Sequence, residues 1–303
     1  MGTSTTIAAR DPRAARRHAI LCVLSASATF TIGSAVVKAL TTEFPVMEIV
    51  AFRSFIAFLS LLPLLWRHGG MAALATCRPL GHLLRTGCGF VATATTVYGY
   101  AVLPLATVTA LGFAMPLFLT VLSVPLLGEH VGPRRGSAVL AGLGGVLLML
   151  RPWEQTDALP PVAVAIVLSG VVAWALAMIS IRRMGETGER NVTIVAWYSL
   201  GTAALAALAA LPDWIAPTLP QLAALVAAGL MSGIAQLLMT EGYRSGETTL
   251  LAPFEYGAIV YATILGIVLW DEWPDAWSLL GVAVLIGAGL YIWRREVALG
   301  IRR

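Results

Sequence analysis

Ten apolar segments, separated by short polar connections, run along the 303-residue chain. Most approach the roughly 20 residues with which a helix crosses about 30 Å of hydrocarbon. The shortest, 136–150, reaches only about 22 Å at about 1.5 Å per residue, so it must extend into its flanks or thin the bilayer locally. The pattern predicts an all-α integral membrane protein with ten transmembrane helices, at 18–40, 46–66, 81–103, 106–127, 136–150, 161–181, 191–211, 221–240, 250–270 and 276–293.

Composition supports the membrane assignment. Hydrophobic residues make up 58% of the chain and charged residues 12%, whereas a soluble domain carries about 25% charged residues. The first apolar segment follows four arginines and resembles a signal peptide in that respect, but it is too long and lacks a clear cleavage context. We therefore expect a retained first helix.

Lysine and arginine are distributed unevenly between the connections, which predicts orientation. With the N-terminus in the cytoplasm, the outer side holds only Arg151, and Lys38, Arg53 and Arg85 fall within or at the ends of helices. The cytoplasmic side then holds Arg10, Arg13, Arg16, Arg17, Arg67, Arg78, Arg134, Arg135, Arg182, Arg183, Arg190, Arg244, Arg294, Arg295, Arg302 and Arg303. This bias predicts a multi-pass inner (plasma) membrane protein with both termini cytoplasmic, and it favours orientation over nucleic-acid binding as the reason for the basic balance.

Two sequence echoes at one offset indicate an internal duplication. Ile49-Val-Ala-Phe-Arg-Ser54 returns 145 residues later as Ile194-Val-Ala-Trp-Tyr-Ser199, and the glycine-rich stretch 136–144 returns as 281–289. Ala138-x3-Gly142 and Ala283-x3-Gly287 are equivalent small-x3-small faces, a pattern suited to close helix packing.

Five helices per half is an odd number, so the second copy must be inverted relative to the first. The loop after helix 4, residues 128–135, is basic, and its counterpart 271–275 carries three acids and no base. Such duplicated bundles place transporter substrate sites near the bilayer midplane. The predicted organisation is a cytoplasmic tail 1–17, a first five-helix repeat 18–150, an external linker 151–160, a second repeat 161–293 and a cytoplasmic tail 294–303.

Further pairs of equivalent positions carry a family resemblance. The first copy has Pro45, Glu48 and Arg53, then Tyr100-x3-Pro104 leading into Pro116, Leu127-Gly128-Glu129 and Gly136-x5-Gly142. The second has Gly242-Tyr243, Pro253, Glu272 and Gly281-x5-Gly287. Together these resemble the EamA-type drug/metabolite transporter (DMT) superfamily over nearly the whole chain. The resemblance implies two inverted five-helix halves around a central cavity and secondary transport of a small metabolite, with neither substrate nor direction fixed.

Charged residues inside the apolar segments are the first candidates for chemistry, because a charge in hydrocarbon normally faces the bundle interior. Arg53 is expected to bind a substrate carboxylate; the alternative is a structural arginine tied to Glu48 or to backbone carbonyls. Glu48 and Lys38 are gating candidates, expected to form an ion pair at the outer mouth. Glu255 is the candidate for proton coupling, since burial favours the protonated form of a carboxylate; the alternative is an acid stabilising a helix N-terminus.

Aromatic and amide side chains complete the candidate substrate site. Tyr98, Trp174, Tyr198, Gln236 and Tyr256 lie within or near predicted spans, although interfacial placement is the default for tyrosine and tryptophan. Pro116 and Pro253 are candidate helix kinks, either at the binding site or merely shaping the bundle. Arg53 recurs as Tyr198 in the second copy, so the two halves are expected to carry an asymmetric charge.

The preferred function is export of amino acids or related amphipathic metabolites by alternating access, with uptake of a similar metabolite as the alternative. Rival classes are a pore or lipid scramblase, and a membrane enzyme using His18, His68, His82 and His130, whose spacing matches no helical metal motif. The lone lysine, Lys38, lies outside any P-loop pattern, which argues against ATP hydrolysis. We expect no catalytic residue, metal or cofactor, and no partner beyond a small-molecule substrate and the lipid bilayer.

Overall fold

The structure, a computed structural model, describes residues 12–67, 69–127, 133–150, 153, 159–245 and 254–298, and all regular secondary structure in these ranges is helical. The first half contains α1 (Pro12–Leu40), α2 (Val46–Arg67), η1 (Gly70–Leu74), α3 (Pro79–Val102), α4 (Leu105–Gly112), α5 (Met115–Leu127) and α6 (Pro133–Leu150). The second contains α7 (Pro161–Glu186), α8 (Asn191–Ala210), η2 (Leu211–Asp213), α9 (Leu219–Ser245), α11 (Gly257–Trp270) and α12 (Ala276–Ala298).

The ten predicted spans correspond to these helices, with α4 and α5 sharing the fourth. Six helical stretches of the described chain are long and apolar enough to cross a membrane, and α6, α11 and α12 contain shorter apolar stretches. Helix α6 has 18 residues, which extends the weakest predicted span to about 27 Å. The prediction of an all-α, ten-helix membrane protein is confirmed.

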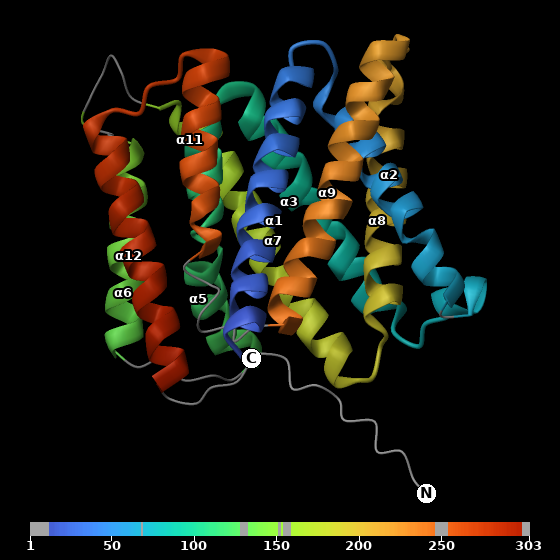
Figure 1. The fold of residues 1–303 in the computed structure, drawn as a ribbon, viewed down its shortest axis with the longest axis horizontal. Coiled ribbons are helices and arrows are strands. Elements are labelled where there is room, and N and C mark those ends of the chain that lie inside the picture. Colours follow the sequence, from blue (N-terminus) through green and yellow to red (C-terminus); the bar gives the residue numbers. More distant parts are fainter. Residues whose placement is uncertain are drawn as a thin grey trace, which may run out of the picture.

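The two halves interlock through their first and third helices. Helix α1 packs along α9, and its counterpart α7 packs along α3; α2 pairs with α8, and α6 with α12 at one edge of the bundle (Figure 1). Small residues permit these crossings: a Cβ added to Gly99 of α3 would lie 2.7 Å from Val167 of α7, and one added to Gly33 of α1 would lie 3.2 Å from Met231 of α9. Each contact therefore recurs in inverted form.

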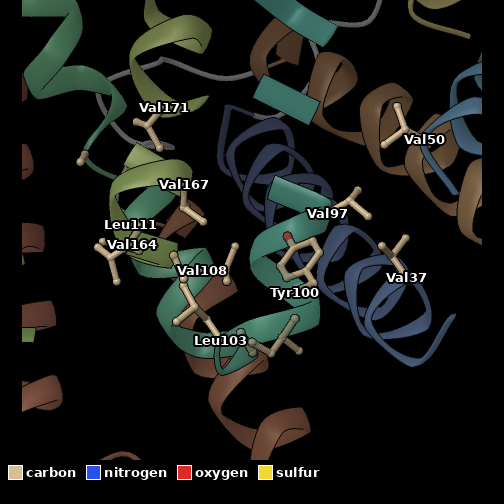
Figure 2. Packing of buried hydrophobic residues seen from close by; sticks show 14 of the residues in the cluster. Val37, Val50, Val97, Tyr100, Leu103, Val108, Leu111, Val164, Val167 and Val171 are labelled. Carbon is tan, nitrogen blue, oxygen red and sulfur yellow. The ribbon is translucent and has the colours of Figure 1, made fainter. Parts of the chain in front are cut away.

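The main buried cluster lies where both halves meet. Figure 2 shows part of it, including Val37 from α1, Val50 from α2, Val97 from α3, Val108 from α4 and Val164 from α7. Because these side chains come from both halves, neither half contains the whole core by itself.

Hydroxyl groups in this apolar bundle find acceptors on their own helices. Thr31 donates to the carbonyl of Ser27 at 2.8 Å, and Thr96 donates to that of Ala92 at 2.7 Å. Lipid supplies no partner for a polar group, so such local hydrogen bonds allow serine and threonine to lie inside membrane helices.

Helices α6 and α12 touch through reciprocal glycines. A Cβ added to Gly145 would lie 2.7 Å from the Gly281 carbonyl oxygen, and one added to Gly281 would lie 2.5 Å from the Gly145 carbonyl oxygen. Gly142 of the first predicted small-residue face is packed against Leu117, whereas Gly287 of the second has no neighbour within 4 Å of its would-be Cβ. The two predicted faces are therefore not used equally.

This contact yields a matched pair of substitutions. Gly145→Val should lower the apparent melting temperature in detergent by several degrees, since backbone on backbone cannot repack and overpacking costs about 1–3 kcal/mol. Gly144→Val is the control, because a Cβ there meets nothing within 4 Å. Thermal unfolding followed by size-exclusion chromatography measures both, and equal losses would contradict the proposed contact.

Candidate functional site

A buried ion pair joins the two halves at the end of the bundle opposite the start of α1. Lys38 Nζ, in the last turn of α1, lies 2.7 Å from Glu272 Oε1 in the α11–α12 connection. The same ammonium donates to the Leu103 carbonyl at 2.7 Å and lies 5.3 Å from the ring centroid of Trp270. We call Lys38, Glu272, Leu103 and Leu105 the terminal lock.

The end of α11 aims Glu272 at the lysine. Asp271 adopts the left-handed conformation with φ 54°, and its N–H donates to the Ile267 carbonyl at 3.1 Å, which closes the helix with an αL-type cap. The Glu272 N–H donates to the Gly266 carbonyl at 3.1 Å. The carboxylate then folds over Gly266, and its Oε2 accepts the Leu105 N–H at 2.9 Å. The lock thus ties α1 and α4 of one half to α11 of the other.

The predicted pair between Lys38 and Glu48 is wrong, because each has a different partner. Glu48 is fully buried at the start of α2, and its Oε2 accepts the Ile215 N–H at 3.0 Å. Its Oε1 has no hydrogen-bond partner among the described residues. Beside it, Phe52 packs against Trp214 with ring centroids 5.6 Å apart. Glu48 therefore fastens the segment after η2 onto α2.

Arg53 reaches from α2 to α9. Its Nε donates to Ser232 Oγ at 3.1 Å, and Gln236 lies one turn further along α9. The guanidinium is half-buried and, within the described chain, forms no ion pair with Glu48 or any other carboxylate. The alternative that tied it to Glu48 is therefore wrong.

A second guanidinium, that of Arg85, lies between α3 and α8 against Tyr198; Tyr198 was a predicted site residue and Arg85 was not. Arg85 Cζ sits 3.9 Å from the Tyr198 ring centroid, and the Tyr198 hydroxyl is hydrogen-bonded to Thr93 Oγ1 at 2.9 Å. The sequence offered one signal for it, a positive charge inside an apolar segment. Tyr198 is thus linked to a cation rather than replacing one.

The fourth and ninth spans are both interrupted, and the interruptions meet. Two turn residues, Phe113 and Ala114, separate α4 from α5 just before Pro116, and Tyr256 is a turn residue just before α11. The rings of Phe113 and Tyr256 lie 4.6 Å apart. These residues are equivalent at the 143-residue offset that relates Glu129 to Glu272. Pro253 lies outside the described residues.

The other predicted residues are spread around these features. Trp174 of α7 is 44% exposed and lies beside Gly112 at the first interruption. Glu255 is half-buried in the helical turn before Tyr256, and Tyr98 is partly buried against the main cluster. Within the described chain no hydrogen bond or ring contact joins Arg53, Tyr198 and Tyr256 to one another, so the candidates lie at three separate places rather than in one cluster.

Neither the histidines nor the open groove in the part of the chain that is described forms a second candidate site. His18 lies 3.8 Å from Glu241, and His82 Nε2 lies 3.3 Å from Glu189 Oε1 without the alignment of a hydrogen bond. No group of three or more potential metal ligands occurs among these described residues, and His68 and His130 fall outside them. An open groove of about 620 Å³ near η2 is apolar, lined by Ala204, Ala207, Leu208, Leu211 and Trp214.

Known proteins resemble the chain over most of its length. The EamA-like transporter family model matches residues 17–151 and again 161–294. A riboflavin transporter of Rhizobium johnstonii is 31% identical over 96% of both chains. An S-adenosylmethionine uptake transporter of Rickettsia bellii is 28% identical (84% of this chain, 86% of the relative), and a pseudopaline exporter of Pseudomonas aeruginosa is 29% identical (92% and 97%). A solved crystal structure with 20% identity aligns at TM-score 0.64 over 94% of this chain and 99% of its own, which shows the fold alone.

The terminal lock can be tested by a double-mutant cycle. Lys38→Met and Glu272→Gln should each destabilise the protein strongly, because breaking a buried pair costs about 3–5 kcal/mol, whereas the double variant should lose much less than the sum. Thermal unfolding measures the three variants, with exposed Asp213→Asn as the control at the same end. Additive losses would refute direct coupling between the two side chains.

Proposed function

The chain belongs to the EamA-like transporter family, and from that premise we propose that it is a secondary carrier of small amphipathic metabolites working by alternating access. The first choice is export of amino acids or related compounds from the cytoplasm. The observation that carries the proposal is the terminal lock, which ties two inverted halves at one end of the bundle through a 2.7 Å ion pair.

Alternating access requires contacts between the halves that can break and reform. The lock is such a contact, since Lys38 and Leu105 belong to one half and Glu272 to the other. Its release would leave the α1 end and the α11–α12 connection free to separate at that side. The predicted charge map makes this side external, so the lock would close the outer mouth.

Arg53 and the helix interruptions favour a substrate with an anionic group and an apolar body. A guanidinium binds a carboxylate with two hydrogen bonds, and Arg53 offers its charge without a carboxylate partner in the described chain. Interrupted helices present backbone groups to ligands, and Trp174 and Tyr256 border the two interruptions. Gln236, one turn from Ser232, supplies a further polar group on the α9 side.

Relatives of similar identity move small metabolites in different directions. Two are named for uptake and export, of S-adenosylmethionine and of pseudopaline respectively, and a third is named a riboflavin transporter. Uptake is therefore the alternative direction within the same mechanism. A pore or scramblase is the alternative of another class, and it would lack saturable exchange.

Counterflow in proteoliposomes tests substrate class and Arg53 together. A panel of labelled amino acids, nucleosides and vitamins should include at least one compound with saturable exchange. For that compound, Arg53→Ala should lower kcat/KM about 10- to 100-fold, the range of a lost charge-assisted hydrogen bond. Arg53→Lys should recover part of the loss.

Arg67→Ala is the matched control, because Arg67 is exposed at the far end of the same helix. Conductance or lipid flipping without saturable exchange would point to the pore or scramblase. Normal transport by Arg53→Ala would remove Arg53 from the substrate site.

Proton coupling through Glu255 makes a separate prediction. In vesicles loaded with the transported compound, an external medium more acidic than the lumen should accelerate efflux by proton antiport. Glu255→Gln cannot exchange a proton, so it should lose this acceleration while keeping counterflow at equal pH. Glu241→Gln, an exposed acid on α9, serves as control. Unchanged acceleration in Glu255→Gln would assign coupling elsewhere.

A further inference from the structure

The guanidinium of Arg85 lies between α3 and α8 beside two hydroxyl-bearing side chains, Tyr198 and Thr93. It lies over the Tyr198 ring at 3.9 Å, and Thr93, which bonds the Tyr198 hydroxyl, is two turns further along α3. Its Nε is buried without a hydrogen-bond partner. Since Arg85 is six residues from the start of α3, it lies about 9 Å from that end of the helix.

This position is the inverted equivalent of the Arg53 position. The α3–α8 contact corresponds to the α9–α2 contact, because α3 and α9 are equivalent, as are α2 and α8. Arg53 reaches from α2 to Ser232 of α9, whereas Arg85 extends from α3 to Tyr198 of α8. The residue equivalent to Ser232 is Gly89, and the Tyr198 ring packs directly against it.

The α2–α9 interface and the α3–α8 interface therefore each hold a guanidinium. In the first it comes from α2, whereas in the second it comes from α3, which is the equivalent of α9. Arg53 is seven residues from the start of α2 and Arg85 six residues from the start of α3, and these helices start at opposite ends of the bundle. Neither guanidinium forms an ion pair within the described chain. Each of the two inverted interfaces thus holds a partly buried guanidinium with hydrogen-bond donors not used by a carboxylate of the described chain. Such a pair could bind one anionic group that arrives from either side of the bundle.

We propose that Arg85, with Tyr198 and Thr93, forms a second anion-binding subsite, which takes the substrate carboxylate when the bundle is open at the end where α1 begins. Arg53 takes the same group when the opposite end is open. The inference rests on the proposed transport function and narrows its substrate to compounds that carry a carboxylate or a similar anion.

Cys88 provides a local probe, because it lies three residues from Arg85 on α3 and is partly exposed. With Cys22 and Cys77 replaced by alanine, N-ethylmaleimide labelling of Cys88 is measured in nanodiscs of phosphatidylcholine. Phenylacetate should slow labelling at least about threefold, and phenylacetamide, which lacks the charge, should not. Removing Arg85 changes the reactivity of the neighbouring Cys88 thiol. The labelling rate with phenylacetate is therefore divided by the rate without it in each variant, and these ratios are compared.

Arg85→Gln should raise the phenylacetate concentration for half-protection at least about tenfold, and Arg85→Lys should restore part of it. Arg67→Gln, at an exposed position at the end of α2, should leave protection of Cys88 unchanged. Each variant is first shown to be monodisperse, because a cation that merely stacks on Tyr198 would affect stability and not the difference between acid and amide. Equal effects of acid and amide, or full protection in Arg85→Gln, would overturn the subsite.

An anionic lipid headgroup is the other source of the same chemistry. Phosphatidylglycerol added to the nanodiscs should leave protection by phenylacetate intact; if it protects Cys88 by itself and abolishes the phenylacetate effect, the subsite belongs to lipid. Labelling of Cys88 does not depend on transport, so the experiments distinguish a failure of the subsite from a failure of the proposed transport function. Absence of counterflow in the unaltered protein refutes the carrier, whereas normal counterflow without protection refutes only the subsite.

Discussion

The packing of each half's first helix against the other half's third helix determines the rest of this structure. With α1 on α9 and α7 on α3, the buried cluster contains side chains from both halves, and neither half contains the whole core by itself. In lipid, where apolar burial between helices gives little driving force, such contacts depend on small residues and close backbones. Gly33 and Gly99 permit the close approach of the helices at these crossings.

Equivalent positions of the two inverted halves make similar interactions through different residue types. The position of Glu48 in α2 is equivalent to that of Thr193 in α8, and each bonds a connection that lies beside it, through Ile215 N–H in one case and the Ala73 carbonyl in the other. The cations of the α2–α9 and α3–α8 contacts are likewise equivalent in place but come from different helices. Arg53 and Arg85 both belong to the first half, so the two interfaces each hold a cation although Tyr198 stands at the position equivalent to Arg53.

Departures from regular backbone occur at the two helix interruptions and at the terminal lock. The fourth and ninth spans break at Phe113–Ala114 and at Tyr256, where the two halves face each other. Asp271, with positive φ, ends α11 and directs Glu272 into the terminal lock. Helices without such features satisfy their own backbone hydrogen bonds, as the hydrocarbon core of a bilayer requires.

The sequence by itself determined the ten helices, the duplication and the family, because hydropathy and repeat spacing are local properties that survive in any packing. It also identified Arg53, Lys38 and Glu48 as charges that need an internal environment. Only the tertiary structure decided their partners: Lys38 meets Glu272, 234 positions away, while Glu48 meets Ile215. Which charges meet depends on how inverted helices cross, and sequence spacing within one helix contains no information about a neighbour from the other half.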